Sequence, residues 1–187
     1  MDLGRKFANS SRTSPVLVSQ LTPTDVAEYR RVRLRALEEH PEAFRSSGDE
    51  EAAKPLSWWQ ERLAAREQSN TSFFGAWSTE RELIGTAGLI FETRPKTRHT
   101  AKIVGMYVAP EHTARGIGAH LLAACVGFAR ADPTMEFLYL TVTNTNAGAI
   151  RLYERSGFQA YGCEPGSMKI GNRAFDKVLM YLSLRSD

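Results

Sequence analysis

The spacing of apolar positions changes several times along the chain and predicts about seven strands and four helices. Val178, Met180 and Leu182 alternate with a period of two, which is typical of a strand. Ile117, Leu121 and Cys125 recur at helical spacing instead. Read in this way, strands are expected at residues 16–21, 72–77, 82–91, 101–108, 137–142, 158–161 and 174–184, and helices at 23–39, 58–66, 115–131 and 146–157.

The order of these elements predicts an α/β fold with a mixed, mostly antiparallel sheet. Turn-rich segments separate the three consecutive strands between residues 72 and 108, as in an antiparallel meander. There is no internal repeat and no interdomain linker. We therefore expect one domain at residues 15–187, preceded by a flexible tail at residues 1–14 that lacks the apolar core of a secretory signal.

Composition narrows the functional classes. The 187 residues suit one globular core, and a formal charge of +3 does not demand a nucleic-acid partner. The longest apolar stretch, residues 121–129, is about half of what a membrane-spanning helix needs. Cys125 and Cys163 match neither a metal-ligand pair nor a disulfide framework, so we expect a reduced, cytoplasmic setting and no metal.

The segment 106–118, with the sequence MYVAPEHTARGIG, carries the main chemical signal. A strand ends at Val108, and the following helix opens with Gly116 and Gly118, so unpaired backbone amides and the helix dipole can bind phosphate. The dinucleotide fingerprint needs a small residue where Leu121 stands, and a P-loop needs Gly-Lys-Ser/Thr, which is absent. A tight turn of purely structural purpose remains the alternative.

Further motifs extend this segment: Asn146 with Ala149, Ile150, Leu152 and Tyr153, and then the pair Gly157-Phe158. Together with Val108-x-Pro110 and residues 113–118, their order and spacing resemble the GNAT superfamily of acyl-CoA-dependent N-acetyltransferases over about residues 15–184. The resemblance implies a splay between the central strands that takes the pantetheine arm of acetyl-CoA, and a glycine loop that binds its pyrophosphate. The implied cofactor residues are Met106, Tyr107, Val108, Thr113, Ala114, Arg115, Gly116, Ile117, Gly118, Ala119 and Asn146.

The resemblance also implies that Tyr153 acts as the general acid for the departing thiolate. Asn146, which is expected to cap the same helix, lies two turns before Tyr153 on one face. The general base is open: Glu92 is the first candidate, His99 is its rival, and a water chain can replace both. The superfamily loop usually begins with arginine or glutamine where this chain has Thr113, so altered cofactor affinity is expected.

The acceptor is expected to be a primary amine of a small molecule, peptide or protein. Residues 40–59, which include Phe44, Trp58 and Trp59, occupy the place that often shapes the acceptor pocket in the superfamily, although core packing also explains the tryptophans. The arginines at 30, 31, 33 and 35 suggest an acidic ligand or a solvated helix face. A non-catalytic acetyl-CoA sensor is the competing function, and a homodimer is possible.

Overall fold

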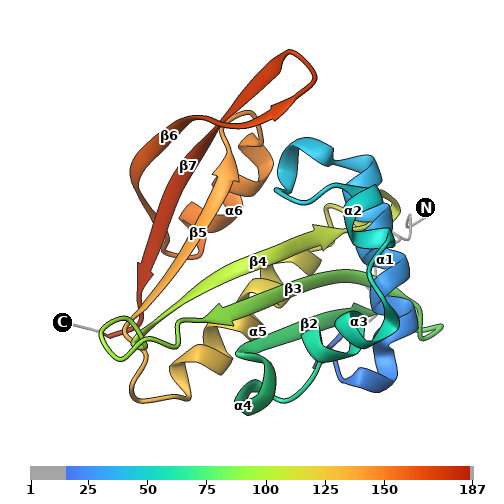
Figure 1. Ribbon diagram of the computed structural model, residues 1–187. Helices are drawn as coiled ribbons and strands as arrows, with labels where there is room; N and C mark the ends of the chain where they lie inside the picture. The colour runs from blue at the N-terminus through green and yellow to red at the C-terminus, as the bar shows by residue number, and fades with distance from the viewer. Residues whose placement is uncertain (1–15, 186–187) are drawn as a thin grey trace, which may run out of the picture.

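The computed structural model describes residues 16–185, which form a single seven-stranded sheet with helices on both faces (Figure 1). The predicted tail at residues 1–14 lies outside the described residues. The strand order is β1-β2-β3-β4-β5-β7-β6, with antiparallel pairs throughout except for the parallel pair β4 and β5. The strands are β1 (Leu17–Gln20), β2 (Thr71–Trp77), β3 (Leu83–Phe91), β4 (Thr100–Val108), β5 (Phe137–Thr143), β6 (Gln159–Ile170) and β7 (Arg173–Ser183). The mixed α/β fold is thus confirmed.

Four of the helices correspond to those predicted from the sequence. They are α1 (Val26–Glu39), α3 (Leu56–Arg62), α5 (Ile117–Arg130) and α6 (Ala147–Arg155), and the first turn of the predicted first helix is a 3-10 turn, η1 (Pro23–Asp25). Helix α6 ends as expected, because Gly157 adopts the left-handed conformation with φ 90°.

Two short helices were not predicted: α2 (Gly48–Ala52) and α4 (Arg66–Ser69). Neither is long enough to show an apolar period. The start of α2 is set by its cap instead, since Ser47 Oγ accepts a hydrogen bond from Glu50 N at 3.1 Å. The prediction of one helix over residues 58–66 was wrong at its end, because α3 stops at Arg62 and the separate helix α4 begins at Arg66.

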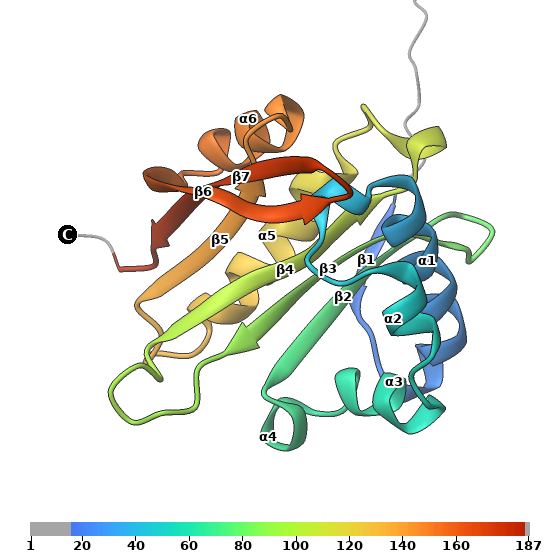
Figure 2. The ribbon, with the colours of Figure 1, turned by 45° about the horizontal axis from the view of Figure 1, so that its top comes forward.

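Strand β6 is much longer than the expected residues 158–161. Pro165 lies within it and cannot donate a hydrogen bond to β7. The pairing with β7 skips from Glu164 to Met168 and so passes over the proline. The resulting hairpin of β6 and β7 extends past the end of β5 and returns beside the segment that follows α1 (Figures 1 and 2).

Two apolar clusters lie on opposite faces of the sheet. One contains the buried face of α5, including Leu121 and Cys125, together with Tyr153 of α6. The other packs α1 and α3 against the first strands through Tyr29, Trp59 and other residues. The helices are thus divided between the two faces of the sheet.

Strands β4 and β5 separate after a short common start. Their parallel pairing joins Thr100–Lys102 to Phe137–Tyr139 and does not continue. Figure 1 shows the two strands diverging from there toward their carboxyl ends. The expected splay is therefore present, and it leaves the edge of β4 from residue 103 to residue 108 without a strand partner on the side of β5.

Candidate functional site

The loop after β4 presents a continuous run of free backbone amides at the open end of the splay. Thr113 N donates to Pro110 O and His120 N donates to Gly116 O, but within the described chain the amides of residues 114–119 have no acceptor. Ala114 and Gly116 adopt left-handed conformations, with φ 60° and 75°. Such a turn directs successive N–H groups into one concavity and forms an anion site, to which the start of α5 adds its dipole.

The amide loop is held close to both strand β4 and helix α6. A Cβ on Gly118 would lie 3.2 Å from Leu152 Cδ2 and 3.9 Å from Val108 Cγ2, so the absence of a side chain permits this approach. Thr113 Oγ1 donates to Pro110 O at 2.8 Å and completes the 3-10 turn η3 (Pro110–His112). The proton of the threonine hydroxyl is therefore used within the protein, and only its lone pairs remain for a ligand.

Strand β4 bends beside the splay through a β-bulge. Thr86 pairs with Tyr107 and Gly88 with Val104, which leaves two residues of β4 opposite one of β3. Gly105 takes φ 63° at this point, and the Thr86 hydroxyl donates to Gly105 O at 3.0 Å. The bulge thereby turns Met106–Val108 along the open edge, where their backbone can accept an extended ligand arm.

Tyr153 of α6 belongs to the apolar cluster that also contains Cys125 of α5, and its side chain is only 5% exposed. Its ring packs edge-on against Phe158 with centroids 5.9 Å apart, and no described residue hydrogen-bonds to its hydroxyl. Burial, with a smaller contribution from Cys125, raises the pKa of Tyr153, so the phenol stays protonated at neutral pH. A proton donor without an internal partner is thus available there.

Asn146 is the N-cap of α6, as predicted. Its Oδ1 accepts from Ala149 N at 3.0 Å, and its side chain is exposed. Capping uses the carbonyl oxygen only, so the amide NH₂ group remains available to a ligand.

The structure does not bring Glu92 or His99 to this end of the sheet. Glu92 follows the last residue of β3 and forms an ion pair with Lys102 at 2.9 Å, while Phe91 pairs with Ala101 at the start of β4. Six residues of strand separate Glu92 from Thr86 at the bulge, or about 20 Å. His99 lies in the same distant loop, where its carbonyl accepts from Glu136 N. Because β3 and β4 run antiparallel, the residues that link them are remote from the amide loop, and neither is placed to act as base.

A carboxylate network that sequence reasoning missed lies at the near end of β4. Tyr107 Oη donates to Glu39 Oε2 at 2.6 Å, and Arg35 bridges Glu39 and Glu111. The hydrogen bond from Tyr107, together with Arg35, lowers the pKa of Glu39, whereas burial and Glu39 raise the pKa of Tyr107. The sequence marked Glu39 only as the last residue of a helix. Its partner is visible only once the bulge places Tyr107 on the same face as α1.

The buried Lys177 anchors the segment after α1 to the end of β5. Its Nζ donates to Glu42 O at 3.1 Å, to Ala43 O at 3.2 Å and to Thr143 Oγ1 at 2.7 Å, and its side chain is 1% exposed. Thr143 Oγ1 in turn donates to Glu42 O at 2.6 Å. Burial lowers the pKa of Lys177. These bonds fix the 3-10 turn η2 (Pro41–Ala43) beside the splay.

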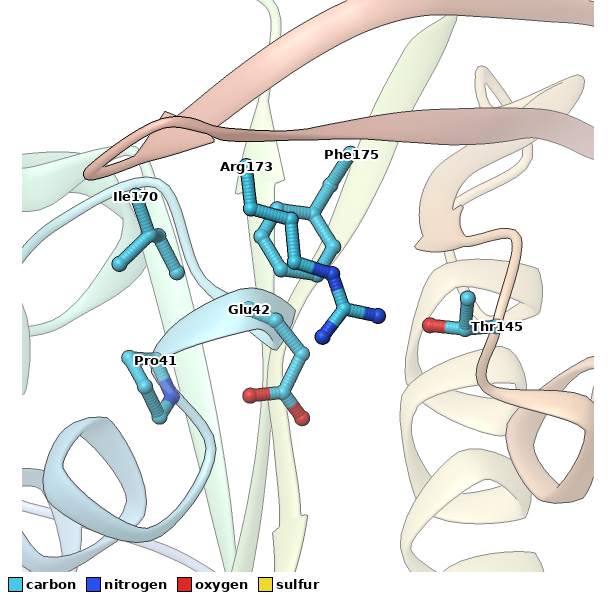
Figure 3. A pocket seen from close by; sticks show the side chains of 6 residues that line it. All are labelled: Pro41, Glu42, Thr145, Ile170, Arg173 and Phe175. Atoms are coloured by element: carbon cyan, nitrogen blue, oxygen red, sulfur yellow. The ribbon is translucent and has the colours of Figure 1, made fainter.

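A pocket of about 420 Å³ opens between η2, the end of β5 and the end of the β6–β7 hairpin. It is lined by Pro41, Glu42, Thr145, Ile170, Arg173 and Phe175 (Figure 3). Thr145, which lines the pocket, directly precedes Asn146 in the sequence. The pocket therefore lies next to the start of α6.

The predicted acceptor aromatics have a structural explanation. Trp59 is fully buried and packs edge-on against Tyr29 and Trp58. Phe44 lies under the guanidinium of Arg33, which is 4.6 Å from the ring centroid. None of these three aromatic side chains lines the pocket. Of residues 40–59, which were expected to shape an acceptor pocket, Pro41 and Glu42 line it.

The arginines of α1 are bound within the protein and do not form an open basic patch. Arg33 forms a buried ion pair with Glu51, Arg31 pairs with Glu28, and Arg30 donates to Ala52 O.

Cys125 is buried, which raises the pKa of its thiol to about 12, in agreement with a packing role.

Within residues 16–185, no helix combines the length and the apolar character needed to cross a bilayer. In the same part of the chain, no group of three or more histidine, cysteine, aspartate and glutamate side chains is gathered as metal ligands would be.

The splayed sheet with its amide loop defines a protein of the acyl-CoA-binding transferase class. The acetyltransferase (GNAT) family profile matches residues 33–158, and the chain belongs to that family. The streptothricin acetyltransferase of Streptomyces lavendulae is 30% identical over 121 residues, which is 65% of this chain but only 61% of that relative.

Solved structures show the same fold at low identity. A GNAT-family acetyltransferase from Streptococcus pneumoniae superposes with a TM-score of 0.79 at 21% identity, over 90% of this chain and 99% of that one. A phosphinothricin acetyltransferase from Sinorhizobium meliloti, solved with acetyl-CoA, gives 0.76 at 18% identity, over 90% and 88% of the two chains. These structures show the fold, and the family profile confirms the family membership expected from the sequence.

Proposed function

We propose that this protein transfers the acetyl group of acetyl-CoA to a primary amine by direct attack within a ternary complex. The observation that carries the proposal is the run of free amides at residues 114–119, placed at the open end of the gap between β4 and β5. A pyrophosphate fits such a loop, and the bent edge at Met106–Val108 fits an extended amide-containing arm. Acetyl-CoA combines both features, and it supplies an acetyl group activated as a thioester.

The chain supplies three functions to this reaction. The free amides hold the cofactor, with Arg115 able to add a charged contact and Asn146 Nδ2 a further donor. Amides of the open edge near Val108 stabilise developing negative charge on the thioester oxygen. Tyr153 donates its proton to the departing sulfur. Its raised pKa makes it a weak acid, so this transfer has to accompany cleavage of the carbon–sulfur bond.

Deprotonation of the amine is assigned to water at the open pocket. A lysine-like ammonium is neutral in only about one part in a thousand at pH 7, so an acceptor for the proton is required. Glu92 and His99 are too distant for that step.

The test is acetyl-CoA binding by calorimetry, followed by thiol release with a broad amine panel. The panel includes streptothricin, because the Streptomyces relative is named for it. Tight binding with turnover of at least one amine is expected. Binding without turnover of any amine favours a non-catalytic sensor, for which the lack of a nearby base is the supporting observation. Absence of binding would overturn both functions.

A further inference from the structure

The pocket beside η2 is lined by one acidic and one basic side chain that do not form an ion pair with each other. Figure 3 shows the guanidinium of Arg173 extending into the space between Glu42 and Thr145, with the carboxylate of Glu42 turned away from it. Within the described chain, the Arg173 side chain forms neither an ion pair nor a hydrogen bond with another residue. The guanidinium fork, with its five N–H donors, is thus free to bind a ligand.

Both groups are held in place by contacts that leave their charged ends free. The Arg173 guanidinium stacks over the Phe175 ring at 4.8 Å from the centroid, which uses its face and not its N–H edge. Glu42 is fixed through its backbone, because its carbonyl accepts hydrogen bonds from both Lys177 Nζ and Thr143 Oγ1. Among residues 16–185, the one ion pair of the Glu42 carboxylate is with His40 Nδ1, at 3.6 Å.

We propose that this pocket binds the acceptor as an amino acid, with Arg173 holding its carboxylate and Glu42 its ammonium group. This inference rests on the proposed function and names the substrate class of the same site. An arginine fork matches a carboxylate in two parallel hydrogen bonds, and a free carboxylate in the same pocket is the complement of an ammonium group. A ligand with both charges satisfies the two side chains at once, whereas a simple amine leaves Arg173 unpaired.

The remaining lining selects an apolar side chain. Pro41, Ile170 and Phe175 present carbon surface, and the volume of about 420 Å³ falls within the usual range for small-molecule sites. A peptide N-terminus fits less well, because its first residue has an amide where the amino acid has a carboxylate.

The experiment compares leucine, methionine and phenylalanine with their amides and their decarboxylated amines. Binding to the protein saturated with CoA is measured by calorimetry, and kcat/KM by thiol release with acetyl-CoA. At least one amino acid is expected to bind about 10- to 100-fold more tightly than its amide and its amine, because a charged hydrogen-bond pair distinguishes them. Rates are compared per neutral amine, since the amides have lower amine pKa values.

Two variants and a matched control assign the preference to the pocket. Arg173→Gln is expected to raise KM for the amino acid about 10-fold or more while leaving KM for the amide within about twofold. Glu42→Gln is expected to weaken binding of all three ligand types. Lys169→Gln removes an equal charge from an exposed position on the same hairpin and is the control. It should change neither the KM for the amino acid nor the KM for the amide.

Equal binding of the amino acids, amides and amines, or no binding of any amino acid to the CoA-saturated protein, would overturn the inference. If acetyl-CoA binds and an amine is turned over in that case, the proposed function still holds. If acetyl-CoA itself does not bind, the proposed function fails, and the inference fails with it.

Discussion

Replacement of Tyr153 by phenylalanine separates catalysis from folding in this protein. The substitution removes one hydroxyl and keeps the ring that packs on Phe158. No described residue pairs with that hydroxyl, although the side chain is only 5% exposed. Its oxygen is not among the fully buried side-chain atoms without a partner in the described chain, so the hydroxyl still reaches water. The variant should therefore be about as stable as the parent protein.

Loss of a general acid lowers kcat by about 10²- to 10⁴-fold. Tm should stay within about 2–4 °C of the parent value, which corresponds to about 1 kcal/mol in a chain of this size. Burial keeps the pKa of Tyr153 above its ordinary value, so the phenol is protonated throughout the neutral range. The shape of the pH–rate profile between about pH 6 and 9 should consequently be the same in both proteins.

The assay is thiol release at saturating acetyl-CoA and amine, combined with thermal unfolding followed by circular dichroism. Tyr161→Phe is the matched control, because that side chain is 55% exposed on β6 and contributes nothing to the proposed site. A kcat for Tyr153→Phe within about threefold of the parent value would refute the general-acid role. A large fall in Tm would instead show that the hydroxyl has a structural partner.

Three other changes test separate parts of the structure. Gly116→Ala forces a side chain into a left-handed conformation at a cost of about 1–2 kcal/mol, so calorimetry should show acetyl-CoA affinity reduced roughly 5- to 30-fold. Lys177→Met removes the bonds that fix η2 to Thr143, and steady-state kinetics should show KM for the amine rising more than KM for acetyl-CoA. Glu51→Ala leaves Arg33 buried without its partner and should cost about 3–5 kcal/mol in urea unfolding. Burial opposes ionisation of Glu51, but the interaction with Arg33 is stronger and lowers the pKa of Glu51. The ion pair therefore stabilises the folded protein above about pH 4.3, and this stabilisation is lost as the pH falls further. The Glu51→Ala variant should not show that loss.

The sequence predicted the elements and the anion loop because both depend on local patterns. Strand alternation, helical spacing and the glycines at 116 and 118 act within a few residues, and the structure has most elements where these patterns indicated them, with the ends of α3 and β6 as exceptions. Short capped helices such as α2 could not be predicted, because five residues are too few to show an apolar period.

Relations between distant residues could not be read in this way. Glu92 is, with His99, the titratable residue nearest to the central strands in the sequence, but the antiparallel register of β3 and β4 places it at the far end from the amide loop. Glu42 and Arg173 lie in separate elements, and no spacing rule connects them. A polar residue in a strand, such as Lys177, likewise gave no sign that three neutral oxygen atoms would surround it.

The hydrogen bonds of Lys177 fix the position of the pocket relative to the gap between β4 and β5. A buried cation with only neutral hydrogen-bond partners is expensive unless every donor is satisfied, and all three bonds of Lys177 are made to η2 and the end of β5. The turn that carries Glu42 is thereby joined rigidly to the strand that forms one side of the splay. Since the same strand leads directly to Asn146 and α6, the proposed acceptor pocket and the gap between β4 and β5 are fixed relative to each other before any ligand binds. If the pocket binds an amine as proposed, it does not need to close around that amine, so discrimination between amines should depend on KM and on the charges that line the pocket rather than on a conformational step.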